Sequence, residues 1–321
     1  MTLLKTMPPD RQNLSYDIYD LDDHLLLLAS DRVAAFGQVL PDLIPNKGRA
    51  LTQLSIFWYE LMESIIDTHF LSADIADLPE RFQPFAAELE GRSILVKKLE
   101  EYPITAEVNG YLTSRLLAEY EQHGTVGGVE ASSGLQLNSL LEQCIYIPYL
   151  EEDNSQTAAV AEGRASAVDE TSASHPIILS DSSSRSSLGQ QIDLTRTVEL
   201  FGTRDAMVLC SNALDLYEIA HGLARSRGII FADLQLRFGR QDNQIILTAV
   251  PNPDTSSLWP AANYQAGIEQ SALIQQALID WYSANWDHQS ALPALPYEII
   301  QTIEQGYIQA FELISGEQFQ A

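Results

Sequence analysis

The sequence is poor in basic residues, and this limits the partners it can take. Its 321 residues include 18 Lys and Arg against 44 Asp and Glu, a formal net charge of −26. Such an excess of acid disfavours broad contact with DNA, RNA or anionic membrane surfaces, although a local basic pocket remains compatible with it. We therefore expect no nucleic-acid and no membrane partner, and instead an unidentified protein or small molecule.

Cysteine, paired histidine and long apolar runs are also scarce. The two cysteines, Cys144 and Cys210, form no CxxC pattern, and the six histidines form no HxxxH or HExxH pattern. These absences disfavour a disulfide framework or a zinc site, and no GxSxG elbow or P-loop occurs. No run approaches 18 apolar residues, and the opening MTLLKTMPPDRQN is too polar for a signal peptide. The expected location is the cytoplasm.

Apolar periodicity predicts a mixture of strands and helices. Residues 30–48, which contain Pro and Gly, are interpreted as a long connection, and residues 228–260 begin with a predicted hairpin. His221 falls on the apolar face of a predicted helix, which favours a core or boundary position. Strands are expected at 16–19, 24–29, 93–98 and 104–108, and helices at 50–66, 112–122, 204–225, 271–285 and 296–314.

The composition changes between residues 151 and 190. This stretch has ten serines among its 40 residues, and its one apolar run is HPIIL. Such a composition is typical of a mobile insertion. Two interpretations stay open, namely a regulatory segment that is phosphorylated and a tolerated surface loop.

Several segments together resemble the SAICAR synthase family, in the family's order and over almost the whole chain. The resemblance implies an α+β fold of two lobes with a cleft between them. The β-rich N-terminal lobe would span residues 1–103, and the α/β C-terminal lobe residues 104–321, interrupted by the insertion at about 151–190. The segments are DIYDLDDHLLLLASDRVAAF, LIPNKGRALTQLSIFWYE, LEGRSILVKK, GYL with EY and GTVGG, GIIFADLQLRFG, PDTSSLWPAANY and YIQAFELISG.

The resemblance also implies a reaction and its ligands. The family joins the carboxylate of an aminoimidazole ribotide, CAIR, to the amine of aspartate in purine biosynthesis, and it uses ATP and Mg²⁺. Carried over position by position, the resemblance assigns Lys98, Glu100 and Asp233 to the nucleotide, with Asp233 also a metal ligand. It assigns no catalytic residue. Asp31 and Arg32 could instead form an internal ion pair, and Lys98 could be an exposed strand residue. The positions it assigns to substrate are Ser30, Asp31, Arg32, Lys47, Arg92 and Ser93.

Other family positions have lost their charge. The two cations of the family's Gly-Lys-Val-Arg-Asp motif are Leu14 and Tyr16 here, and the Lys of a later strand is Gln235. The Asp-Glu metal pair of the next strand is replaced by Thr248 and Ala249. One expected Mg²⁺ ligand, Asp233, is therefore left.

The family's phosphate-holding Arg, Ser and Arg are replaced by Asn109, Arg115 and Ser257. Arg115 and Arg237 are new cations, which could form a different anion site or could pair with Asp233 or Glu119. Loss of three charge-assisted contacts to phosphate costs about 5–9 kcal/mol, or roughly 10³- to 10⁶-fold in affinity.

Three hypotheses follow from these replacements. In the first, the chain has lost or greatly weakened the family reaction and acts as a pseudoenzyme, a binding protein or a regulator. In the second, it is an ATP-dependent ligase of changed substrate specificity in a specialised pathway. In the third, it is a true SAICAR synthase with compensating residues.

Overall fold

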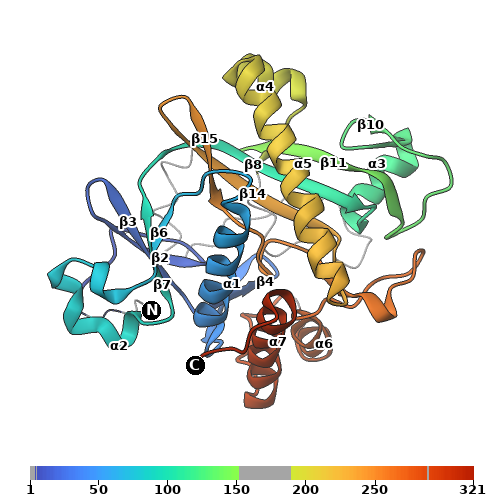
Figure 1. Ribbon diagram of the computed structural model, residues 1–321. Coiled ribbons are helices and arrows are strands. Elements are labelled where there is room, and N and C mark those ends of the chain that lie inside the picture. Colours follow the sequence, from blue (N-terminus) through green and yellow to red (C-terminus); the bar gives the residue numbers. More distant parts are fainter. Residues whose placement is uncertain (1–3, 5, 152–188, 288) are drawn as a thin grey trace.

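The computed structural model describes residues 4, 6–151, 189–287 and 289–321 (Figure 1). The predicted insertion at 151–190 therefore lies almost wholly outside the described residues. Within them, two five-stranded sheets and a set of helices confirm the predicted α+β class.

The first sheet is antiparallel, and its strands come from residues 11–97. Its strand order is β1-β2-β3-β7-β6. Leu26 and Leu28 alternate along β3 and are fully buried against a small core that includes Phe82. The strands are β1 (Arg11–Gln12), β2 (Tyr16–Asp20), β3 (His24–Ala29), β6 (Phe70–Ser72) and β7 (Ser93–Lys97).

The long connection predicted at residues 30–48 is wrong, because this stretch contains a second hairpin. Strand β4 (Arg32–Ala35) pairs with β5 (Gln38–Leu43). The turn places Phe36 and Gly37 at positive φ, 53° and 73°. Val33 and Leu40 are buried in a core shared with the C-terminal helices. Tertiary packing therefore stabilises strands that the Pro and Gly content argued against.

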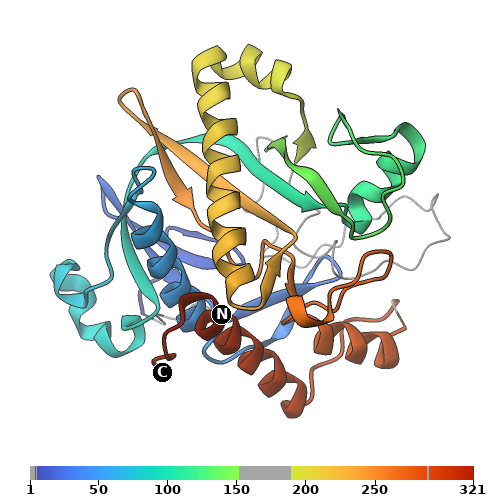
Figure 2. The same cartoon turned by 45° about the vertical axis from the view of Figure 1, so that its right-hand side comes forward.

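The second sheet has the order β12-β11-β8-β14-β15, and helix α5 (Thr203–Ser226) crosses one of its faces (Figures 1 and 2). Val108 and Leu234 contribute to the core under α5. Because side chains alternate along a strand, the residues on either side of Val108 in β8 and of Leu234 in β14 face the opposite side of the sheet. The strands are β8 (Glu100–Tyr111), β11 (Leu140–Leu150), β12 (Gln190–Gln191), β14 (Asp233–Gln241) and β15 (Gln244–Ala249).

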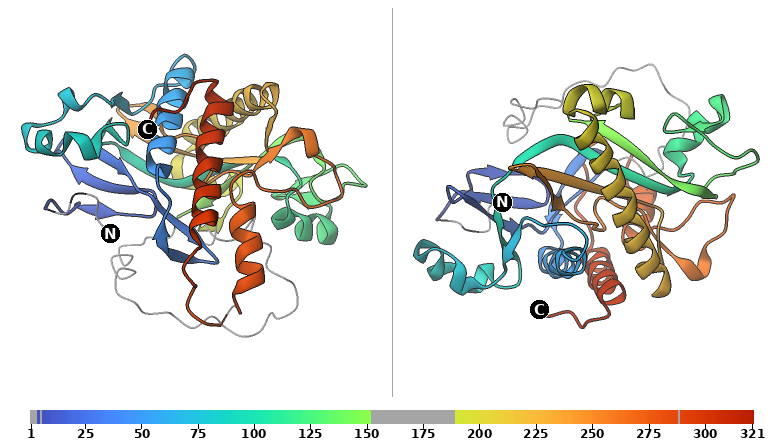
Figure 3. Two further views of the ribbon diagram at one scale, coloured as in Figure 1. Left: turned by 90° about the horizontal axis from the view of Figure 1, so that it is seen from below. Right: turned by 45° about the horizontal axis from the view of Figure 1, so that its top comes forward.

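Three helices pack together beside the sheets. Helix α1 (Lys47–Met62) lies against α7 (Tyr297–Ser315), which also contacts α6 (Gln276–Asn285) (Figure 3). The described remainder includes α2 (Ala86–Leu89), α3 (Ser114–His123), α4 (Leu194–Phe201), β9 (Thr125–Val126), β10 (Val129–Glu130), β13 (Ile229–Phe231) and β16 (Leu258–Pro260).

The predicted elements are recovered with shifted ends. α5 departs by one residue at each end from the predicted 204–225, whereas α1 begins three residues earlier than predicted and ends at Met62. α6 begins at Gln276, five residues after the predicted start. The chain runs through the predicted lobe boundary at residue 103 without a break in β8, so that boundary stays a prediction.

Candidate functional site

A buried ion pair joins the first half of the chain to the second. Lys47, in the first turn of α1, is 0% exposed, and its Nζ lies 2.6 Å from Oδ2 of Asp254. The Tyr307 hydroxyl on α7 donates to Oδ1 of Asp254 at 2.6 Å. Burial, and then the neighbouring Asp254 carboxylate, raise the pKa of Tyr307 well above its usual range. Burial and Asp254 also raise the pKa of Tyr16, at a position where the family motif has a cation.

A second ion pair corrects an expectation from the sequence. Asp31 and Arg32 do not pair with each other. Asp31 instead pairs with Arg92 at 3.1 Å, and its Oδ1 accepts the backbone N–H of Gly48 at 2.8 Å. A Cβ at residue 48 would lie 2.7 Å from the carbonyl oxygen of Ala29, so this close approach requires glycine. Asp31 and Arg92 thus hold the start of α1 against the first sheet.

Arg32 and Ser30 hold the loop before β2. Arg32 pairs with the fully buried Asp17 at 2.9 Å and also donates to the carbonyl oxygen of Asn13. The Ser30 hydroxyl donates to the carbonyl oxygen of Leu14. The expected substrate residue Ser93 is similarly engaged, because its hydroxyl donates to the carbonyl oxygen of Leu89 at 2.9 Å.

The expected nucleotide residues are not brought together. Lys98 is 42% exposed and pairs with Asp20 at 2.6 Å. The alternative considered for Lys98, an exposed strand residue, is confirmed in its exposure, although β7 ends one residue earlier, at Lys97. Glu100 is opposite Arg240, whereas Asp233 is opposite Asn109 at the other end of the β8–β14 ladder. A nucleotide contact through Lys98 and Glu100 would therefore be separate from one through Asp233.

The face of the second sheet that lies opposite α5 carries three buried polar residues and one half-buried polar residue, which together we call the polar face: Glu107, Asn109, Asp233 and Gln235. The first three are 0% exposed. Asp233 is directly opposite Asn109, and Gln235 is opposite Glu107, so each pair lies on the same face. One oxygen of Asp233 accepts the backbone N–H of Ser257 at 3.0 Å.

Glu107 is the functional candidate that sequence reasoning missed. It pairs with Arg115 of α3, and it accepts hydrogen bonds from the Asn109 side chain at 2.8 Å and from the Gln235 side chain at 3.4 Å. Arg115 also donates to the Tyr149 hydroxyl. The signal was present, because Glu107 is an acid between the apolar residues Ala106 and Val108 of a long strand, where a buried charge has to be paired.

The two new arginines pair with carboxylates other than the expected Asp233 and Glu119. Arg115 pairs with Glu107, and Arg237 pairs with Glu101 at 3.0 Å and Glu151 at 2.9 Å. Glu119 instead closes the GTVGG loop, where it accepts the backbone N–H groups of residues 127 and 128 at 3.0 and 2.8 Å. The amides of that loop are thus taken by a carboxylate of the same chain.

The positions of the missing metal pair lie at the end of β15. Thr248 is buried, and its carbonyl oxygen accepts from the Tyr59 hydroxyl, which also contacts His69 Nε2 at 2.9 Å. Desolvation lowers the pKa of His69 to about 3. Across the described residues, no group of three or more His, Cys, Asp or Glu side chains is placed to hold a metal ion.

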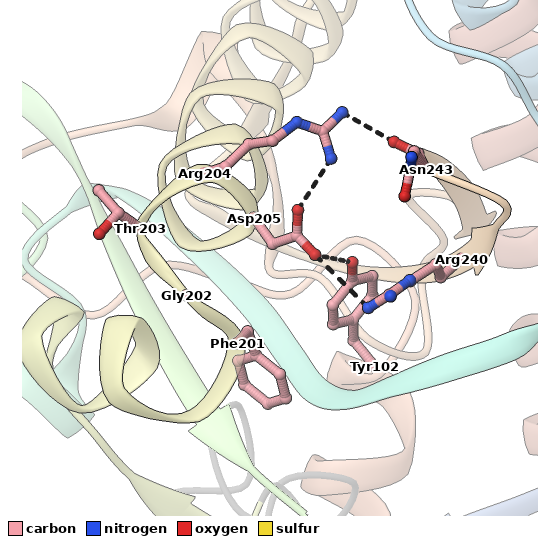
Figure 4. Close-up of a pocket in the computed structure, with 8 residues that line it drawn as sticks. All are labelled: Tyr102, Phe201, Gly202, Thr203, Arg204, Asp205, Arg240 and Asn243. Atoms are coloured by element: carbon pink, nitrogen blue, oxygen red, sulfur yellow. Dashed lines mark hydrogen bonds and ion pairs between the residues drawn. The ribbon is translucent and has the colours of Figure 1, made fainter.

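A separate cavity of about 330 Å³ lies at the start of α5 (Figure 4). Arg204 at 3.1 Å and Arg240 at 3.8 Å both approach the Asp205 carboxylate, which also accepts from the Tyr102 hydroxyl at 2.6 Å. Burial, with Asp205, raises the pKa of Tyr102 to about 12. Because both arginines share one acid, this network joins α5 to the β14–β15 hairpin.

His221 occupies the boundary position that was expected for it. It is half-buried, stacks on Tyr217 and lies 3.0 Å from the carbonyl oxygen of Phe231. Desolvation lowers its pKa. In the part of the chain that is described, no helix has both the length and the apolar character needed to cross a membrane.

Comparison with known proteins supports the resemblance. Residues 15–293 match the family model described as SAICAR synthetase. The chain is 33% identical to the phosphoribosylaminoimidazole-succinocarboxamide synthase of Desulforapulum autotrophicum, over 98% of each chain. A solved structure of the Saccharomyces cerevisiae SAICAR synthase, complexed with SAICAR, superposes with a TM-score of 0.82 at 26% identity and covers 100% of this chain and 98% of the yeast chain.

A more distant structure has the same fold. It is described as a SAICAR synthetase in complex with ADP, and it superposes with a TM-score of 0.63 at 18% identity, over 97% of this chain and 99% of that one.

Proposed function

Because the chain belongs to the SAICAR synthase family, we propose that it is an ATP-dependent ligase that joins a carboxylate to an amine. We further propose that it uses CAIR and aspartate, the family's own substrates, much less efficiently than its relatives do. The family membership supports the reaction class. The replacements at Asn109, Gln235 and Thr248 support the weakened use of those substrates.

One observation supports the proposal that the polar face is still a functional site, with new residues in place of the family's residues. Glu107 is fully buried on the polar face, yet it has a cation and two amide groups as partners. An uncompensated buried carboxylate is strongly destabilising, so it persists only with such partners. If the family's binding residues had only been lost, apolar or unpaired residues would be expected on the polar face. The complementary set at Glu107, Asn109, Arg115 and Gln235 favours a site that still has a use.

The polar face does not fit the phosphates of a nucleotide with its metal. Mg²⁺ is commonly held by one or two carboxylates together with phosphate oxygens, but Asp233 shares this face with a second buried carboxylate, Glu107, which would repel a phosphate. Lys47 and Arg92 instead position the start of α1, through their ion pairs with Asp254 and Asp31.

A second candidate is a binding or regulatory protein without catalysis. It is favoured by one specific observation, which is that the cations matching the family motif are engaged inside the protein. Arg32, Lys47 and Arg92 each pair with a carboxylate, with distances of 2.6 to 3.1 Å. A protein that had lost its catalytic activity would retain these three residues because their ion pairs stabilise the fold.

The test measures ATP binding and ATP turnover side by side with the Desulforapulum autotrophicum relative. Calorimetric titration with ATP and Mg²⁺ gives the affinity, and a coupled assay gives ADP release with CAIR and aspartate and with a panel of other carboxylates and amines. We expect ATP turnover that depends on a carboxylate and an amine, and a rate with CAIR and aspartate at least about 10³-fold below that of the relative.

Each alternative has its own result. Full rescue of a strain that lacks its own SAICAR synthase would refute the weakened use of the family substrates and leave a true synthase with compensating residues. No binding at millimolar ATP, and no turnover with any pair, would refute the ligase and favour the binding protein.

A further inference from the structure

The polar face is electrostatically unsuited to a phosphate. Glu107 and Asp233 are both 0% exposed and lie on neighbouring strands, on the same side of the sheet. A phosphate placed there would meet two carboxylates at low local dielectric, where like charges repel strongly.

The nearby cation is already engaged. Arg115 lies in the first turn of α3, and its guanidinium group donates hydrogen bonds to both Glu107 and the Tyr149 hydroxyl. Its guanidinium carbon also lies 5.5 Å from the centre of the Tyr149 ring. Its side chain is 22% exposed. A phosphate that drew Arg115 away would weaken the compensation of the buried Glu107 carboxylate, so binding of that phosphate would be penalised.

The same face offers an acceptor instead. The Asn109 side-chain NH₂ donates to Glu107 at 2.8 Å, which fixes the orientation of the amide. Its Oδ1 is buried and has no hydrogen-bond donor among the residues that the structure describes. A buried acceptor without a donor is costly, and a ligand that supplies an N–H or O–H removes that cost.

We infer that Glu107 determines specificity by holding Arg115 and thereby excluding a phosphate from the polar face. The ligand that this face takes carries N–H or O–H donors at that end and no negative charge. The inference rests on the proposed function only in assuming that the substrate binds at the polar face. It concerns which ligand binds there, whereas the proposed ligase activity is tested separately through ATP turnover.

The experiment compares a nucleoside with its own phosphate. Titration calorimetry on the full chain would give the affinities for aminoimidazole carboxamide riboside and for its 5′-phosphate. In the unaltered protein we expect the riboside to bind at least as tightly as the phosphate. Glu107→Gln releases Arg115 while keeping the side-chain shape, so we expect the affinity ratio to shift toward the phosphate by about tenfold or more.

A matched control removes an acid of the same sheet that lies elsewhere. Glu101→Gln removes the same charge at an exposed ion pair with Arg237, where the glutamate side chain is 45% exposed, and we expect the ratio to stay within about twofold. A second variant, Gln235→Lys, places a cation opposite Glu107 and should shift the ratio in the same direction as Glu107→Gln. It keeps the test decisive should Glu107→Gln fail to fold.

Three results would overturn the inference. They are a phosphate preference above tenfold in the unaltered protein, a shift in Glu107→Gln or Gln235→Lys no larger than in Glu101→Gln, and no binding of either compound to any variant. None of these results depends on ATP turnover, so a failure here is distinguishable from a failure of the proposed ligase.

Discussion

Replacement of Lys47 by Met is expected to destabilise the protein far more than loss of an ordinary surface charge. The Lys47 side chain is 0% exposed and its partner Asp254 is 10% exposed. Without the ammonium group, the Asp254 carboxylate stays buried with its charge uncompensated by that partner. Breaking a buried pair in this way costs about 3–5 kcal/mol. With an unfolding entropy of about 2.1 cal/mol/K per residue, a chain of 321 residues loses roughly 1.5 °C per kcal/mol, so Tm should fall by about 4–8 °C.

The chain offers a matched control in Lys98→Met. Lys98 and Asp20 are separated by the same 2.6 Å, but their side chains are 42% and 37% exposed. An exposed pair contributes about 0–1 kcal/mol, so Tm should fall by less than about 2 °C. The two variants therefore separate the effect of burial from the effect of ion-pair distance.

Differential scanning calorimetry at pH 7, at low and high salt, is the assay. Salt should reduce the small effect of Lys98→Met and leave that of Lys47→Met nearly unchanged, because buried pairs are poorly screened. Adding Asp254→Asn to Lys47→Met should recover part of the lost stability, since the stranded charge is removed. Equal shifts for the two single variants, or no recovery in the double variant, would refute the reasoning.

Three further predictions concern one buried histidine and two glycines. Desolvation lowers the pKa of His69 from 6.5 to about 3, so the stability due to its neutral form is complete above pH 6.5 and is lost as the pH falls toward 3. In urea unfolding across this range, His69→Gln should lack a slope of up to about 1.4 kcal/mol per pH unit, and identical slopes would contradict this. Gly110→Ala should destabilise by about 1–3 kcal/mol, because its Cβ would lie 1.9 Å from the Tyr217 hydroxyl oxygen. Gly222→Ala in α5, with nothing within 4 Å of the new Cβ, should stabilise by about 0.5–1 kcal/mol, and unfolding midpoints that move in the same direction would count against both.

Local patterns predicted the elements that pack along a continuous apolar stripe. The spacing of apolar residues placed α5 within one residue of its observed ends, since one whole side of that helix is buried. The same reasoning missed β4 and β5, where QVLPDL has little periodicity and contains Pro. Those strands are stabilised by contacts between Val33 or Leu40 and the C-terminal helices, which no local window includes.

Ion-pair partners were less predictable than elements. Adjacent charges suggested that Asp31 pairs with Arg32, but adjacent residues of the chain need not face each other. Asp31 pairs with Arg92, 61 positions away, and Arg32 pairs with Asp17, 15 positions away. The first sheet and its neighbouring hairpin bring these residues together, so their partners depend on strand order.

The family, the acidic balance and the identity of every replaced cation follow from the amino-acid sequence, because they depend only on which residues are present and in what order. The partners of the remaining charges depend on how the chain folds. The tertiary structure places Lys47 against Asp254 and Arg115 against Glu107, across elements that are separate in the chain. The physical reason is that a buried charge must find a partner within a few ångströms, and sheet register and helix packing decide which residues lie that close.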